Sequence, residues 1–196
     1  MKTIQPVYGR DFAPGYTLFI KNTRLISQGI EWFESLEEAC DFIASHVCLV
    51  VNENTGVECA EHGVQYTTLT DYFDNTNIQV VCREPEGLDG LTIGQVLDCA
   101  GKMYDNHTPY DYTGLVGFIG IIIIKLSGIF HFLRKLPVPL HIPGARVCSA
   151  FVGDCYKHTD KYKNTELFKN YNISRIDPVL LYNRFPWKPF RFDKTR

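Results

Sequence analysis

Residues 147–156 have the sequence VCSAFVGDCY, and about a hundred residues earlier residues 45–51 have the sequence SHVCLVV. The first segment has the pattern of a helix with Cys148 in its first turn, and the second that of a buried strand that begins near His46. A thiol at a helix N-terminus feels the positive end of the helix dipole, which favours the thiolate. A histidine that the fold brings beside this thiol can take its proton and later return it. The two segments together predict a thiol nucleophile and a histidine base.

The composition is that of one ordinary globular domain. We expect it to span all 196 residues, with a core at about residues 13–182 and an aromatic and basic C-terminal arm at 183–196. A net charge of -2 gives no electrostatic reason to expect a nucleic-acid partner. The seven cysteines are spread singly, without a CxxC motif. We therefore expect no metal site, no cofactor and no redox dithiol, and instead buried, reduced thiols as in a cytosolic protein.

The N-terminal residues 1–8 contain one lysine and no apolar segment, so we expect no secretory signal. The most apolar stretch is residues 115–133, in which Lys125 and His131 interrupt the apolar residues. Its uninterrupted apolar length is about ten residues, half of the ~20 that a membrane span needs. A buried core helix is the favoured interpretation, and peripheral insertion at a membrane surface is the alternative.

Periodicity along the chain predicts a mixed α+β fold with a small antiparallel sheet and helices packed around it. The expected strands are residues 16–20, 46–51, 57–60 and 78–83. The expected helical segments are residues 35–44, 69–73, 92–104, an apolar helix from about 112, 148–158, and a last helix with Pro178 at its first position.

A carboxylate on the strand after His46 completes a possible triad. If residues 52–54 form a three-residue hairpin loop, Cys48 lies opposite Glu58, and His46 and Glu58 lie diagonally on one face. Such diagonals are ~7–8 Å apart, within reach of a glutamate side chain. A carboxylate there would orient the imidazole and stabilise its charged form. A one-residue slip would turn Glu58 to the other face, and His62 is then the reserve candidate for the third role.

Four segments carry a resemblance to a known family. In order they are APGYTLF (13–19), SHV (45–47) with the strand residues 57–64, PYDYTGL (109–115) and CSAFV (148–152). The chain resembles the circularly permuted branch of the NlpC-type papain-like superfamily, the YiiX-like and lecithin:retinol-acyltransferase-like proteins, in which histidine comes first, a polar residue follows and cysteine comes last on a helix. The resemblance covers most of residues 13–182. Two departures are Thr17, where an acidic residue is usual, and Ala150, where a glutamate often follows Cys-Ser.

The resemblance implies a cysteine hydrolase or acyl-transfer enzyme that acts on amide or ester bonds, such as peptidoglycan stem peptides or lipid acyl chains. It implies that Cys148 is the nucleophile, His46 the base and Glu58 the orienting group. Tyr110 and Ser149 would line the substrate or oxyanion site, although Tyr110 fits equally well as a core tyrosine whose hydroxyl lies at the rim. The apolar segment favours acyl or membrane-proximal substrates, and small permuted members of this type are typical of phage.

A structural or interaction module that keeps the fold without turnover is the alternative. Ala150 favours it, as does the aromatic tail at residues 185–190, which could dock on a protein partner. We expect a cytoplasmic or phage-associated protein in contact with peptide or acyl substrate, and with membrane or cell wall at most peripherally. We interpret Asp111 as a helix N-cap and Cys155 as a packing residue rather than a resolving thiol.

Overall fold

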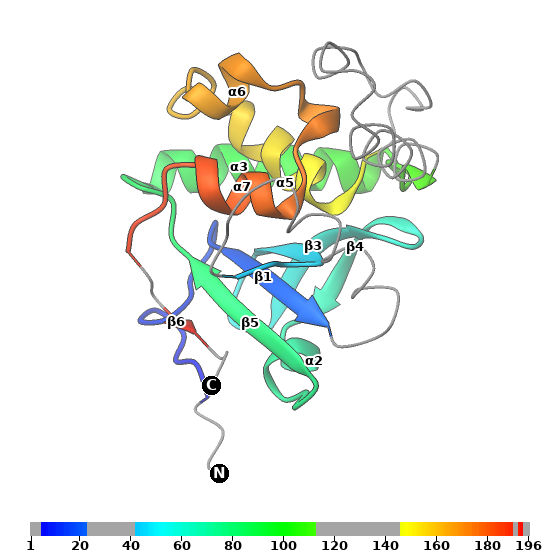
Figure 1. Ribbon diagram of the computed structural model, residues 1–196, viewed down its shortest axis with the longest axis vertical. Coiled ribbons are helices and arrows are strands. Elements are labelled where there is room, and N and C mark those ends of the chain that lie inside the picture. The colour runs from blue at the N-terminus through cyan, green and yellow to red at the C-terminus, as the bar shows by residue number, and fades with distance from the viewer. Residues whose placement is uncertain (1–4, 23–41, 113–145, 190–191, 194–196) are drawn as a thin grey trace, which may run out of the picture.

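The computed structural model describes residues 5–22, 42–112, 146–189 and 192–193. It confirms the α+β class (Figure 1). Within these residues lies one antiparallel sheet with the strand order β4-β3-β2-β1-β5-β6. Its strands are β1 (Thr17–Asn22), β2 (His46–Val50), β3 (Thr55–Ala60), β4 (Gly63–Thr68), β5 (Ile78–Arg83) and β6 (Phe192–Asp193). The helices are α2 (Thr70–Phe73), α3 (Gly90–Asp105), α5 (Cys148–Lys157), α6 (Glu166–Asn170), the 3-10 helix η2 (Ile173–Arg175) and α7 (Pro178–Arg184).

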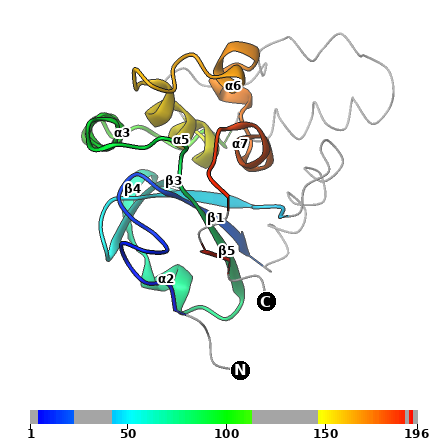
Figure 2. The same cartoon turned by 90° about the vertical axis from the view of Figure 1, so that its left-hand side faces the viewer.

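Both faces of the sheet are covered, which explains why its central strands are apolar on both sides. Helices α3, α5, α6 and α7 lie on one face and α2 lies on the other (Figure 2). Because side chains alternate along a strand, Val47 and Leu49 of β2 join the core under the helices. Cys48 and Val50 join a second core with Leu69, beside α2.

Helix α5 is the most deeply buried helix among the described residues, since eight of its ten residues are buried. It packs on β2 and β3 and between α3 and α7. The Tyr156 hydroxyl in its last turn lies 2.6 Å from the hydroxyl of Thr17 and donates to the carbonyl oxygen of Gly15 at 2.9 Å. Thr17, one of the two departures from the family pattern, is thus a core contact that anchors α5 to β1.

The C-terminal tail packs against the chain's own core over the part that the structure describes. Phe185 is 3% exposed and stacks on Tyr156, with ring centroids 4.6 Å apart. The Trp187 indole donates to the carbonyl oxygen of Leu181 at 3.0 Å. Further on, β6 pairs with β5 and extends the sheet by one strand. The expectation that this arm docks on a protein partner stays a prediction.

The structure confirms most of the expected elements, with ends shifted by a few residues. It adds β4, α6 and β6, which the periodicity does not predict. Residues 42–44, where a helix from residue 35 is expected to end, are not helical, and the rest of that helix lies outside the described residues. The apolar helix that is expected from about residue 112 also lies outside the described residues, except for Tyr112. No helix in the described ranges is both long and apolar enough to span a membrane.

Candidate active site

Cys148 is the first residue of α5, as the sequence predicts. The preceding residue, Val147, has extended backbone angles (φ -89°, ψ 166°) and no side chain caps the helix. The helix's own hydrogen bonds begin where the N–H of Phe151 donates to the carbonyl oxygen of Val147 at 2.9 Å. The N–H groups of the first turn therefore have no acceptor within the helix, and their partial positive charge lies beside the thiol.

The thiol meets β2 where that strand separates from β3. Val50 donates its N–H to the carbonyl oxygen of Tyr16, the residue before β1, and Val51 donates to Thr55 of β3. Because the direction of the N–H groups alternates along a strand, the N–H of Val47 points toward β3. Paired residues of β2 and β3 begin only at Leu49, which leaves the N–H of Val47 on the unpaired stretch. The backbone N–H groups of Val47 and Ser149 both act to lower the pKa of the Cys148 thiol.

His46 and Glu58 are joined in the way that the predicted hairpin requires. Leu49 pairs with Val57, so Cys48 falls opposite Glu58 and His46 lies diagonally from it on the same face. The Nε2 atom of His46 lies 2.8 Å from Oε2 of Glu58. The Glu58 residue is 4% exposed and the His46 side chain 23% exposed. The register is therefore the one that the loop at 52–54 predicts, and the exposed His62 is not needed for the third role.

The electrostatics of Cys148 and His46 are those of an ion pair. Burial alone lowers the pKa of His46, but the charge of Cys148, a hydrogen bond with it and then Glu58 together raise that pKa to about 10. Burial alone raises the pKa of Cys148, but the charge of His46 and a hydrogen bond with it lower that pKa below its ordinary value. Both shifts favour the ion pair, in which the shared proton lies on the imidazole and the sulfur is a thiolate.

Glu58 has two further partners that sequence reasoning misses. The Tyr72 hydroxyl of α2 donates to Oε2 of Glu58, and the Gln65 side-chain amide of β4 donates to Oε1 at 3.2 Å. Gln65 is the residue directly opposite Glu58 in the β3–β4 pair. A two-residue hairpin loop at residues 61–62 would have predicted it, whereas no sequence signal places Tyr72.

Tyr110 is tied by its backbone to the segment that leads into Cys148. The backbone of Tyr110 forms an isolated β-bridge with that of Arg146, two residues before Cys148. Beside it, the N–H of Asp111 donates to the carbonyl oxygen of Arg146 at 3.0 Å. Burial, followed by the charge of Cys148, raises the pKa of Tyr110, so its phenol stays protonated and can act as a donor. Its role toward an oxyanion stays a prediction.

The expectation that Ser149 lines the substrate or oxyanion site stays a prediction for its backbone N–H, because the side chain of Ser149 is bonded elsewhere. Its hydroxyl is fully buried and donates to the carbonyl oxygen of Ile176 at 2.6 Å, which ties α5 to the segment after η2. Successive residues of a helix point about 100° apart, so a side chain next to Cys148 faces a different neighbour. Ala150 is likewise buried in the core under the helices.

Other candidates contribute no catalytic group in the described residues. Cys155 is fully buried and lies in the same core cluster as Cys99, so packing is the role that its surroundings indicate. His158 caps the end of α5, and His141 lies outside the described residues. Across the described ranges no cluster of three or more histidine, cysteine or carboxylate side chains could hold a metal ion.

The chain matches no protein-family model, and a search of curated proteins finds no match to its sequence.

Proposed function

We propose that the protein is a cysteine-dependent hydrolase or acyl-transfer enzyme that acts on amide or ester bonds. The observation that carries this proposal is the set of Cys148, His46 and Glu58: a thiol at a helix N-terminus, an imidazole whose pKa that thiol raises, and a carboxylate 2.8 Å from the ring of the imidazole. Nucleophile, base and orienting group in this order are the elements of nucleophilic catalysis by a thiol.

The geometry supports a two-step reaction. Because Nε2 of His46 is bonded to Glu58, the other ring nitrogen, Nδ1, is the one that can exchange a proton with the thiol. The thiolate attacks the carbonyl carbon of the substrate, and backbone N–H groups at the start of α5 can bind the oxyanion that forms. His46 then gives its proton to the leaving amine or alcohol as the C–N or C–O bond breaks. Water or an acceptor, deprotonated by His46, releases the acyl group from Cys148.

The permuted NlpC-type papain-like fold is the family we propose. Its support is the chain order His46, Glu58, Cys148, together with a nucleophile at a helix N-terminus that packs on an antiparallel sheet. Peptidoglycan stem peptides and lipid acyl esters are the substrate classes that this assignment suggests.

A substrate screen tests the proposal. Purified protein is incubated with muropeptides, lipid acyl esters and acyl acceptors, with Cys148→Ala as the control. We expect cleavage or transfer with one of these classes, a covalent acyl adduct on Cys148, and loss of both in the variant. Turnover that survives in Cys148→Ala would contradict the proposal. A labelled but inert Cys148 would favour the interaction module instead.

Glu58→Gln is expected to keep the fold and lower kcat/KM by more than about tenfold, but by less than Cys148→Ala does. Glutamine still accepts a hydrogen bond from His46 but does not balance the imidazolium charge. Steady-state kinetics on the substrate from the screen, with circular dichroism as the folding control, measures this. A loss as large as that of Cys148→Ala in a folded variant would show that Glu58 does more than orient His46.

A further inference from the structure

Glu58 is held by three side chains from three different elements. Its Oε2 accepts from His46 of β2 and from Tyr72 of α2, and its Oε1 accepts from Gln65 of β4. Tyr72 lies with the core beside α2, on the sheet face opposite the helix that carries Cys148. Its ring centroid is 6.4 Å from that of His46. The partners of Glu58 therefore lie on the α2 face of the sheet, whereas Cys148 reaches His46 from the other face.

A buried carboxylate next to a charged imidazole can take up the proton of that imidazole, and this transfer would disable the site. If the proton of His46 moved to Glu58, both groups would become neutral and the thiolate would lose its counter-charge. Burial of Glu58 favours that transfer, because it penalises the carboxylate. Two neutral donors on the carboxylate oppose it, since they stabilise the charged form without adding charge of their own.

We propose that Tyr72 and Gln65 are positioning residues that form a two-donor clamp on Glu58. The clamp keeps Glu58 charged and fixed toward His46, and thereby keeps the thiolate of Cys148 available. This assignment rests on the proposed function of the same site, and it adds two residues that act through Glu58 without contact with the reacting atoms.

The titratable groups around Glu58 keep a fixed charge near neutral pH, so the clamp acts on the charge of Glu58 itself. Besides His46, the titratable side chains that feel the charge of Glu58 are Cys48 of β2, Cys59 of β3 and Tyr72 of α2. Burial, and after it neighbouring negative charge, raises the pKa of Cys48 and of Tyr72, and raises that of Cys59 to about 12. None of these three ionises near neutral pH. Because the pKa of His46 is raised to about 10, the titration below neutral pH involves Cys148 and Glu58.

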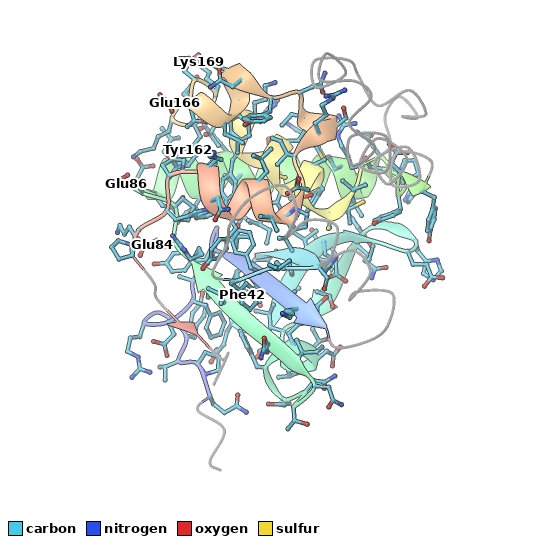
Figure 3. The ribbon with its side chains drawn as sticks, viewed as in Figure 1. Phe42, Glu84, Glu86, Tyr162, Glu166 and Lys169 are labelled. Atoms are coloured by element: carbon cyan, nitrogen blue, oxygen red, sulfur yellow. The ribbon has the colours of Figure 1, made fainter. Side chains whose placement is uncertain are left out.

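The test is the rate of Cys148 alkylation by iodoacetamide as a function of pH, followed by mass spectrometry of the Cys148 peptide. In Tyr72→Phe, Glu58 loses a donor to its charged form and takes up a proton at higher pH. The imidazolium of His46 then loses the negative charge of Glu58. We therefore expect the acid limb of the profile, the low-pH range in which the alkylation rate falls, to move up by about one pH unit. The matched control is Tyr162→Phe. That hydroxyl donates to the carbonyl oxygen of Glu86 at 3.0 Å, near the other end of α5 (Figure 3), and its removal should leave the limb in place.

Gln65 gives a second variant that does not depend on the stability of α2. Gln65→Glu changes almost no volume but places a negative charge opposite Glu58, so we expect a larger upward shift than in Gln65→Met. If Gln65 made a merely structural contact, Gln65→Glu and Gln65→Met would shift the acid limb by the same amount. An acid limb that stays in place in folded Tyr72→Phe and in Gln65→Glu would overturn the clamp, even in an enzyme that turns over substrate. A protein that shows these shifts but cleaves no substrate would contradict the proposed function and leave the clamp standing.

Discussion

Replacing His46 with alanine is expected to slow alkylation of Cys148 near pH 6 by at least about tenfold. After the opposing effect of burial, the charge of His46 and then its hydrogen bond are the largest influences on the pKa of Cys148, and both act to lower it. Without the ring, burial keeps the thiol protonated. The rate is measured with iodoacetamide on the folded variant.

His62→Ala is the matched control, because this exposed histidine lies in the β3–β4 turn. It should leave the rate at Cys148 unchanged. Equal rates in His46→Ala and the unmodified protein would mean that the helix N-terminus alone sustains the thiolate. The role of His46 as the base would then be wrong.

Phe185→Ala is expected to lower the free energy of unfolding by about 3–5 kcal/mol, the usual cost of emptying a phenylalanine site in a packed core. The ring is 3% exposed, stacks on Tyr156 and contacts Tyr162 and Trp187 edge-on or tilted. Chemical denaturation followed by tryptophan fluorescence and circular dichroism measures the loss.

Leu91→Ala is the control for this variant, since Leu91 is 76% exposed on α3 and its removal should change stability by less than about 0.5 kcal/mol. If Phe185→Ala were as mild as Leu91→Ala, the tail would not belong to the core. The arm at 183–196 would then be free to act as a docking segment.

The strand pairing that builds the site is predictable from sequence, and the edge of the sheet is not. The loop at 52–54 fixes the β2–β3 register because the side-chain period of a strand is two. β4 is missed because its sequence, GVQYTT, is mostly polar on one face, as suits a strand with a single neighbour. β6 has two residues and exists only through its pairing with β5. Such short elements depend on tertiary contacts that no local pattern encodes.

Within the site, too, some residues are predictable from the sequence and others are not. Cys148, His46 and Glu58 are predictable because each has a position in its own element that implies its role: a helix start, a strand start and a diagonal across a hairpin. Tyr72 is not predictable, because its contact with Glu58 depends on how α2 docks under the sheet. The orientation of the Ser149 side chain is not predictable from its place next to Cys148, because being adjacent in sequence does not mean sharing a helix face.

The pH profile of Cys148 alkylation in the unmodified protein tests the central claim most directly. Because the pKa of Cys148 is lowered while His46 keeps its proton up to about pH 10, the thiolate should persist well below the ~8.5 of a free cysteine. We therefore predict fast labelling of Cys148 near pH 6, and slow labelling of Cys48, Cys59 and Cys82, whose pKa values burial raises. A rate at Cys148 that is low near pH 6 and rises only above pH ~8.5, no faster than at those three buried thiols, would contradict the account.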